Sequence, residues 1–457
     1  MDMNLNGMHS SGSDARPHPV NGSRPGSAAA AHAPGRPRTA ADTGLTEAFL
    51  GDLVCKHLFE GGVLDLRELT RRTALSGALL QDVCAFLRTD GQVEARGTHP
   101  DSAMLRFGLT DRGRASALEA LGRDGYVGPA PVPLAQYART VENQSLSART
   151  VDFDTLRTGF ADTVIQPKLL DQLGPALHSG RAMFIYGPPG TGKSFIARRL
   201  ARLLAGEVLV PHAITVSGKT IQCFDPGMHE ALHPPHEGDH VKFDQGDDPR
   251  YVRCRRPLAI TGGELTMDML EVQYDETTRS FRAPVQLLAN NGMLVIDDLG
   301  RQRLEPQQLL NRWIVPLEER HDYLMLRNGQ HFRVPFDVVL VFSTNRNPLE
   351  LADQAFLRRI GYKIRFEPLE EADYLTIWQQ ECRHRGIDYD PALARFVLDE
   401  LHARHGVPLL PCHPRDLIDL SVDYGRYMNQ EPLSTEALCR AWETYFVGLD
   451  EPGGMAS

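Results

Sequence analysis

The chain contains 457 residues, of which 42% are hydrophobic and 24% are charged, and its formal net charge is −10. This length predicts two or three domains, and the acidic balance argues against bulk affinity for nucleic acid, though not against a local basic patch. The seven cysteines form no Cys-x-x-Cys pair and no apolar run approaches the ~18 residues that span a bilayer, so we expect a cytoplasmic protein with free thiols, no signal peptide and no membrane segment.

Residues 1–43 are rich in Gly, Ser, Ala, Pro and His and contain almost no apolar cluster, which predicts a disordered tail. From Leu45 onward, apolar residues recur at helical spacing and strand-like runs follow. The predicted elements are helices near 49–59, from 65 and over 76–87, strands at 92–96 and 104–109, and a last helix after 110. Three helices followed by a two-stranded wing resemble a winged-helix domain, which we place at 44–125, before a Pro-rich linker at 126–150.

The charge of this predicted domain bears on its partner. Residues 45–125 contain ten Lys and Arg against twelve Asp and Glu, and the candidate recognition helix at 76–88 carries Arg88 as its one base, together with Asp82. Non-specific DNA affinity depends on a basic face that neutralises phosphates. The sequence therefore favours a domain that docks on a protein over one that binds nucleic acid, with a purely structural role as a third alternative.

A complete phosphate-binding loop lies between a short apolar run, Ala182–Tyr186, and a helical pattern. Its residues are Gly187, Pro188, Pro189, Gly190, Thr191, Gly192, Lys193 and Ser194. This Walker A sequence lets backbone N–H groups surround a phosphate, brings Lys193 to the β- and γ-phosphates and offers the Ser194 hydroxyl to Mg²⁺. The sequence therefore predicts that the chain binds ATP or GTP.

Two further strand-like runs end in polar residues suited to hydrolysis. Met293–Ile296 leads into Asp297 and Asp298, the Walker B arrangement, in which Asp297 would hold Mg²⁺ and Asp298 would orient the attacking water. Val338–Thr344 leads into Asn345, which we expect beside the γ-phosphate, where it holds the water together with Asp298.

With these three motifs in order, residues 153–448, about two-thirds of the chain, resemble the AAA+ ATPases. The resemblance implies an α/β fold, with a P-loop core built on a parallel five-stranded sheet at 151–368 and a C-terminal helical lid at 369–457. It also implies ATP and Mg²⁺ as cofactors, Mg-dependent ATPase activity and a homo-oligomeric ring, commonly a hexamer.

The same resemblance assigns roles to arginines. An arginine finger that completes a neighbouring subunit's site falls just before the final strand, where the register favours Arg359 and leaves Arg358 as the alternative. His413-Pro414-Arg415 at a helix start resembles the sensor 2 motif, which makes Arg415 a contact of the γ-phosphate. For Arg358 and Arg359, an ordinary place on the surface is the competing interpretation.

Two β-hairpins are predicted inside the core, one over 269–285 around a polar turn and one over 323–334 around Asn328-Gly329, a strong two-residue turn signal. Hairpins at these places resemble the helix 2 insert and the pre-sensor 1 insert of MoxR-like and transcription-activator ATPases. The Gly-Ala-Phe-Thr-Gly-Ala loop of the second group is absent, which favours the MoxR-like group. In such rings the hairpins face the pore and act on a protein substrate.

We therefore expect an ATP-driven, chaperone-like remodeller whose protein substrate or adaptor docks through the winged helix. Asp298 stands where most of the family has Glu, so we expect slow turnover. A nucleotide switch with little hydrolysis and a DNA-directed regulator or loader are the alternatives. The segment from His229 to His233 matches the zinc-protease pattern His-Glu-x-x-His, but Pro234 and Pro235 end any helix there, which favours a polar loop. Trp313 is expected in the core.

Overall fold

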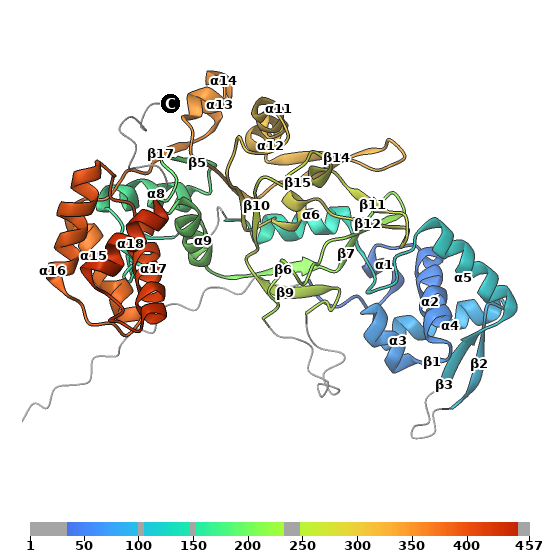
Figure 1. Ribbon diagram of the computed structural model, residues 1–457. Coiled ribbons are helices and arrows are strands. Elements are labelled where there is room, and N and C mark those ends of the chain that lie inside the picture. The colour runs from blue at the N-terminus through green and yellow to red at the C-terminus, as the bar shows by residue number, and fades with distance from the viewer. Residues whose placement is uncertain (1–33, 99–104, 147–150, 233–246, 447–457) are drawn as a thin grey trace, which may run out of the picture. The chain divides into compact units, whose positions relative to one another are not determined.

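A computed structural model describes residues 34–98, 105–146, 151–232 and 247–446. Its main sheet has five parallel strands in the order β10-β13-β16-β5-β17, of which Figure 1 labels β10, β5 and β17. The strands are β5 (Met183–Tyr186), β10 (Leu258–Thr261), β13 (Met293–Ile296), β16 (Val339–Thr344) and β17 (Tyr362–Arg365). The parallel five-stranded sheet predicted from the sequence is therefore confirmed.

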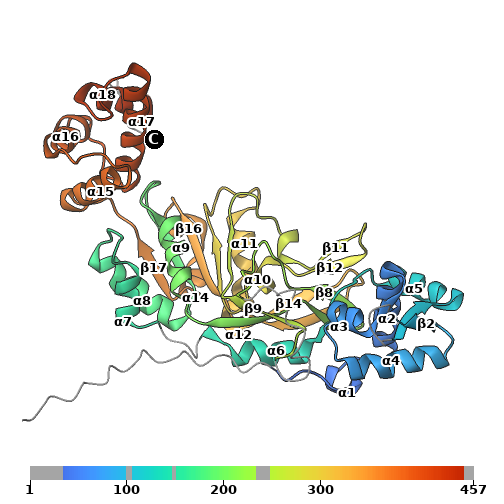
Figure 2. The same ribbon diagram turned by 90° about the horizontal axis from the view of Figure 1, so that it is seen from below.

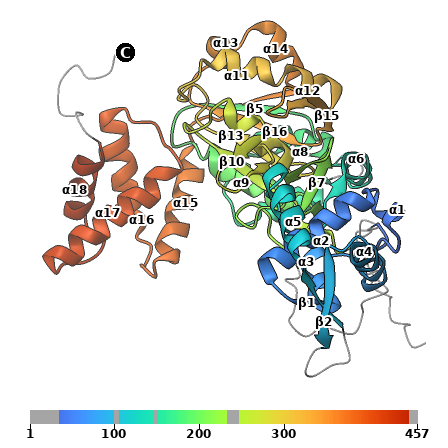
Figure 3. The same ribbon diagram turned by 90° about the vertical axis from the view of Figure 1, so that its right-hand side faces the viewer.

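The central strands β13, β16 and β5 are nearly continuous apolar runs and are covered on both faces, whereas the edge strands β10 and β17 have exposed residues. Met183 and Ile185 face the helices α7 (Phe153–Gly159), α8 (Pro167–Ser179) and α9 (Lys193–Leu203), the last two of which lie beside β17 and β16 in Figure 2. Phe184 and Leu294 belong to the opposite face. The helices covering that face are α10 (Val285–Leu288), α11 (Pro306–Arg312), α12 (Ile314–Glu319), α13 (Pro348–Leu351) and α14 (Gln354–Arg359), of which α11 to α14 gather on one side in Figure 3.

Trp313 lies between α11 and α12 and is 0% exposed, which confirms its predicted place in the core. Its ring is 5.9 Å from that of Phe336, between centroids. Replacing a fully buried Trp by Ala costs about 3–5 kcal/mol in comparable cores. This residue therefore stabilises the helical layer above the sheet rather than forming a binding platform.

A second five-stranded sheet was not predicted from the sequence. Its order is β11-β12-β8-β7-β4, and it packs Tyr137 and Val141 of α6 (Leu134–Asn143) into a core of its own. The strands are β4 (Val132–Pro133), β7 (Ala213–Val216), β8 (Lys219–Gln222), β11 (Gln273–Asp275) and β12 (Ser280–Arg282), and beside them β6 (Glu207–Pro211) pairs with β9 (Tyr251–Arg255). Strands of two to five residues are too short for their alternation to stand out in a sequence.

Both predicted hairpins form, with different bounds. The first is the β11–β12 pair, while Asp268–Leu270 forms a 3₁₀ turn in place of the expected strand. The second pairs β14 (His321–Met325) with β15 (His331–Pro335). Its loop has three residues rather than two, because the Leu326 N–H donates to the Gln330 carbonyl at 2.9 Å and Gly329, at φ 80°, closes the turn.

Residues 40–125, here named the N-terminal helical region, contain the predicted helices and strands in the expected order. Its elements are α1 (Ala40–Thr43), α2 (Glu47–Gly61), β1 (Leu64–Asp65), α3 (Leu66–Thr73), α4 (Gly77–Thr89), β2 (Val93–Thr98), β3 (Leu105–Leu109) and α5 (Asp111–Arg123). Thr46, Asp65, Ser76 and Thr110 cap four of the helices by accepting backbone N–H bonds. The short β1 adds a third antiparallel strand that the sequence did not reveal.

Two predicted boundaries are wrong. The tail predicted for 1–43 is ordered at its end, where α1 forms behind a capping box at Thr39, whereas residues 1–33 lie outside the described ranges. The linker predicted for 126–150 is also wrong over most of its length. Ala130 is fully buried and donates its N–H to the Thr73 carbonyl at 2.7 Å, and the following residues form β4 and α6. The prolines of this segment keep its backbone extended, and the segment packs against the rest of the protein instead of forming a flexible linker.

The C-terminal part is helical, as predicted, and has its own core around Tyr374, Trp378, Leu417 and Trp442. It contains α15 (Glu371–His384), α16 (Pro391–Phe396), a π-helix (Val397–Ala403), α17 (Cys412–Met428) and α18 (Thr435–Tyr445). The domain boundary at 369 stays a prediction. Within the four described ranges, no helix combines the length and the hydropathy needed to cross a bilayer.

Candidate nucleotide site

The Walker A loop connects β5 to α9, which is the context that the motif requires. Gly187, Gly190 and Gly192 have φ values of 146°, 83° and 85°, a region that side chains disfavour. At Gly190 space is also limiting, because an added Cβ would lie 2.6 Å from Sγ of Cys412. The loop therefore depends on its glycines both for its curvature and, at Gly190, for the close approach of Cys412.

Lys193 is buried at the start of α9. Its Nζ donates to the carbonyls of Gly187 at 2.9 Å and Pro188 at 2.8 Å, which keeps the ammonium inside the loop. Burial lowers the pKa of Lys193, and the carboxylates of Asp297 and Asp298 offset part of that effect. A desolvated cation at the centre of such a loop is suited to binding phosphate oxygens.

Ser194 and Asp297 meet although they are far apart in the sequence. The Ser194 hydroxyl donates to Oδ2 of Asp297 at 2.5 Å, which joins the first turn of α9 to the end of β13. Because β5 and β13 are parallel and both flank β16, their carboxyl ends open on the same edge of the sheet. A hydroxyl and a carboxylate in contact form a ligand pair suited to Mg²⁺.

The other two predicted hydrolytic residues also lie together. Nδ2 of Asn345, at the end of β16, is 3.4 Å from Oδ1 of Asp298, and it is the donor. Asp298 has φ 49°, a left-handed conformation that Asp and Asn tolerate better than most residues. The backbone bond from Leu299 N–H to Ser343 O, at 2.8 Å, ties this turn to β16. Four predicted residues on three elements thus converge at one edge.

Two residues at this turn were missed by sequence reasoning. Gln302 donates to the carbonyls of Asp297 at 3.1 Å and Gly262 at 3.2 Å, and its Oε1 accepts the Gly300 N–H at 2.8 Å. The guanidinium of Arg301 lies 3.8 Å from Oδ2 of Asp298. No signal in the sequence distinguishes either from an ordinary polar residue, since their roles arise from the fold of the turn.

Of the three predicted arginines, two are held by other partners and one is exposed. Arg359 on α14 donates to Oε1 of Glu318 at 2.5 Å and to the Ala355 carbonyl at 2.8 Å. Its neighbour Arg358 is exposed. Arg415 on α17 pairs with the adjacent Asp416 at 2.9 Å, which raises the pKa of Arg415. The structure thus brings the Walker A, Walker B and Asn345 positions together, but it does not bring these arginines to them.

A cavity of about 310 Å³ lies beside the loop. Its walls include Ile165 and Leu169 from one side, Tyr186 and Thr191 from the strand and loop, and Phe366 from the segment after β17. A cavity of this size that combines apolar walls with a few polar groups fits a flat heterocycle.

Comparison with known proteins bears on this site. Residues 166–326 match the family model of the AAA ATPase domain, and residues 370–444 match a domain of unknown function (DUF8689). A segment of 67 residues is 35% identical to the vesicle-fusing ATPase of Dictyostelium discoideum, which covers 14% of this chain and 9% of that protein. Solved structures with low similarity include the RuvB Holliday junction branch migration motor of Thermotoga maritima (TM-score 0.34, 13% identity, 67% of this chain and 73% of that chain) and NtrX of Brucella abortus (0.36, 13%, 71% and 59%).

The matched domain model and the arrangement of the main sheet agree. Residues 166–326 have the AAA+ P-loop fold. The AAA ATPase match contains the Walker A loop, Asp297 and Asp298, but it ends before Asn345 and before the arginines of α14. Arg415 falls within the second match. Support from the AAA+ comparison is therefore strongest for the phosphate loop and the Walker B turn.

The described part of the His-Glu-x-x-His segment, residues 229–232, lies within the AAA+ match, and its one histidine contacts the backbone. His229 is buried, its Nδ1 accepts the Asp225 N–H at 3.0 Å, and its Nε2 donates to the Leu288 carbonyl at 2.9 Å. Both ring nitrogens are therefore engaged in backbone contacts. His233 lies outside the described residues, and within those residues no group of three or more His, Cys, Asp and Glu is placed to hold a metal.

Proposed function

We propose that the chain is a Mg-dependent ATPase that remodels a protein partner. The observation that carries the proposal is the pair of contacts at the sheet edge, Ser194 with Asp297 and Asn345 with Asp298. The first provides oxygen ligands for a cation, and the second joins a carboxylate and an amide that both bind water. Beside a glycine loop, this set of groups is suited to the hydrolysis of a nucleoside triphosphate.

Each residue has a role in this proposal. Lys193 binds phosphate oxygens, and Ser194 with Asp297 holds Mg²⁺, which when bound neutralises phosphate charge. Asp298 accepts a proton or hydrogen bond from water that Asn345 helps to orient. The nucleoside lies in the cavity beside Thr191. Because the Asp298 carboxylate is set back by one methylene relative to Glu, and ~1 Å of misplacement can cost ~10²-fold in rate, we expect slow turnover.

Ring assembly would complete the site. An arginine supplied by a neighbour can raise turnover by ~10³–10⁵. The register favours Arg359, but this side chain is paired with Glu318, whereas Arg358 is exposed and accessible to a neighbouring subunit. This difference supports Arg358 as the finger. Arg415 is proposed to reach the γ-phosphate when the C-terminal helices move.

The partner is proposed to be a protein that docks on the N-terminal helical region, whose helices and strand pair follow the winged-helix order. Its balance of charges and the single base of the helix at 76–88 disfavour DNA. The β14–β15 hairpin, at the pre-sensor 1 position, supports placing the chain in the MoxR-like group of the AAA+ proteins. Its identical subunits are proposed to form a hexamer in the cytoplasm.

The test is the steady-state ATPase rate as a function of protein concentration, for the wild type and for Lys193→Ala, Arg358→Ala and Arg359→Ala. We expect specific activity to rise with concentration, to vanish in Lys193→Ala and to vanish in one of the two other variants. A rate equal to that of Lys193→Ala at all concentrations, with ATP still bound, would overturn the enzymatic proposal.

That last result would favour a nucleotide switch, the second candidate. One observation supports it: the short Asp298 carboxylate is already engaged by Asn345 and approached by Arg301, which competes with water for its oxygens. A switch predicts that ATP and ADP change assembly or partner binding without measurable phosphate release.

A further inference from the structure

The turns of the second sheet contact the end of α5. The Gly125 N–H donates to the Arg279 carbonyl at 2.9 Å, the Thr220 N–H donates to Oδ2 of Asp124 at 3.1 Å, and Nζ of Lys219 donates to the Arg123 carbonyl at 2.8 Å. We name this contact the hairpin seam. It joins the N-terminal helical region to β8 and to the turn between β11 and β12.

The seam is tightly packed. An added Cβ at Gly125 would lie 1.8 Å from the Thr278 carbonyl oxygen, so only glycine fits there without moving a backbone. Asp124 is 6% exposed, and Arg279 on the opposite side has φ 50°. Gly122, earlier in α5, has room, because its added Cβ would come no nearer than 3.8 Å to the Arg279 side chain.

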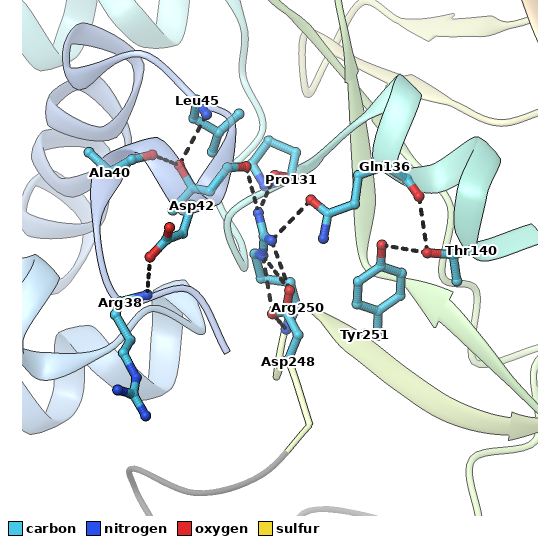
Figure 4. Close-up of polar contacts among 11 residues, drawn as sticks. Arg38, Ala40, Asp42, Leu45, Pro131, Gln136, Thr140, Asp248, Arg250 and Tyr251 are labelled. Atoms are coloured by element: carbon cyan, nitrogen blue, oxygen red, sulfur yellow. Dashed lines mark hydrogen bonds and ion pairs between the residues drawn. The ribbon is translucent and has the colours of Figure 1, made fainter. Parts of the chain in front are cut away.

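A second contact holds the same region from the other end (Figure 4). Arg250 and Asp248 form an ion pair whose side chains are 1% and 0% exposed, with NH2 to Oδ2 at 2.8 Å. Arg250 also donates to the carbonyl of Thr43 at 3.1 Å and to Oε1 of Gln136 at 3.3 Å. The N-terminal helical region is therefore fixed to the ATPase domain at two places rather than tethered by a free chain.

The hairpin seam is connected through the chain to the edge of the main sheet that carries the candidate nucleotide site. After the turn at Arg279, the chain runs through β12, α10 and β13 to Asp297, eighteen residues later. The β14–β15 hairpin, which precedes the Asn345 strand β16, is joined to the same turn. Arg327 in its loop lies 4.9 Å from the ring of Tyr274 and bonds Oε1 of Glu276 at 2.5 Å. The strands β13 and β16, which lead to Asp297 and Asn345, thus each follow elements that form the seam or contact its turn.

We propose that the N-terminal helical region regulates the nucleotide site through the hairpin seam. A partner that occupies this region loosens or tightens the seam, the β11–β12 turn moves, and the end of β13 follows because short hydrogen-bonded elements connect them. The inference rests on the proposed function in that hydrolysis is the regulated reaction. We also expect nucleotide binding to change the stability of the seam, and reciprocity then requires that the seam change the affinity for nucleotide.

The test compares Gly125→Ala with Gly122→Ala as the matched control, in the full chain. Hydrogen exchange at the backbone amides of position 125 and of Thr220 is measured with and without Mg-ATP, together with the affinity for ATP and the kcat and KM for hydrolysis. We expect Gly125→Ala to speed exchange at the seam at least tenfold, to change kcat at least threefold and to change the affinity for ATP. Gly122→Ala should match the wild type, and Mg-ATP should alter wild-type exchange at the seam.

Faster exchange in Gly125→Ala with unchanged kcat and KM would overturn the proposal and leave the seam a structural contact. If Gly125→Ala fails to fold, Lys219→Met is the milder variant, because it removes one hydrogen bond of the seam. It should shift kcat in the same direction as Gly125→Ala. A wild type without ATPase activity would refute the proposed function instead. The inference is then tested by the effect of Mg-ATP on hydrogen exchange in the wild type. An exchange rate at the seam that is the same with and without Mg-ATP would overturn it.

Discussion

Asp298 combines a strained backbone with a short carboxylate. Asn shares its tolerance of positive φ, so Asp298→Asn removes the charge while keeping the turn. We expect kcat to fall at least ~10²-fold with little change in ATP affinity, because in the proposed mechanism the carboxylate acts on water rather than on the nucleotide. Phosphate release and a fluorescent-ATP titration measure the two quantities. An equal loss of both would instead place Asp298 in nucleotide binding.

Arg358 and Arg359 form a natural matched pair on α14. Arg358→Ala should abolish concentration-dependent activity without changing thermal stability, because Arg358 is exposed. Arg359→Ala should lower stability by at most about 1 kcal/mol, since its partner Glu318 is half exposed. Activity at high protein concentration and the unfolding midpoint, measured on both variants, distinguish them. Loss of activity in Arg359→Ala with full activity in Arg358→Ala would restore the register-based assignment.

The residues of the candidate nucleotide site differ in how far the sequence could identify them. Lys193, Ser194 and Asp297 could be predicted because a glycine loop and an apolar strand mark them locally. Gln302 could not, because it acts on a turn whose shape depends on the fold. The choice between Arg358 and Arg359 as the proposed arginine finger depends on how subunits assemble, and the sequence of a single chain says little about assembly.

Among the elements, the C-terminal helices contain a buried pair of histidines. Nδ1 of His402 donates to the Val407 carbonyl at 3.1 Å, and its Nε2 accepts the Tyr374 hydroxyl at 3.0 Å, a pattern that needs neutral imidazole. His413 lies 5.2 Å away between ring centroids. Burial lowers the pKa of His402 and that of His413 to about 4.

This pair predicts acid sensitivity. Both histidines have a pKa near 6.5 when unfolded and near 4 when folded, so the unfolded chain binds protons first as the pH falls. Stability is therefore complete above about pH 6.5 and declines from there to about pH 4, by up to about 3 kcal/mol for each histidine. Urea unfolding followed by Trp378 and Trp442 fluorescence tests this. His384→Gln, at an exposed position at the end of α15, should leave the pH dependence unchanged, and a flat profile in the wild type would contradict the buried neutral pair.

The elements also show why part of the fold escaped prediction. β5, β13 and β16 were placed to within a residue, since each is an apolar run that ends at Gly, Asp or Asn. β4 and β7 were not, because a pair such as Val132–Pro133 becomes a strand only when β7 lies beside it. The helix α6 follows a Pro-rich run that resembles a linker. Local patterns identified the main sheet, whereas the second sheet depends on contacts between distant segments.

At the scale of the whole molecule, charge predicts the choice of partner. The net charge of −10 and the balanced N-terminal helical region should leave no measurable binding of duplex DNA at micromolar protein and about 50 mM salt. Fluorescence anisotropy of a labelled duplex, with and without Mg-ATP, tests the full chain. Binding that weakens steeply as salt rises would favour the DNA-directed alternative.

The Arg250 contact has a consequence for how the molecule is made. The Arg250–Thr43 hydrogen bond spans 207 residues, so the N-terminal helices leave the ribosome long before their attachment point exists. At about 5–20 residues per second the interval is on the order of 10–40 s, ample time for that region to fold alone. During this interval the surface around Thr43 lacks the neighbour that Arg250 provides in the finished protein, and it is open to a chaperone or an early binding partner.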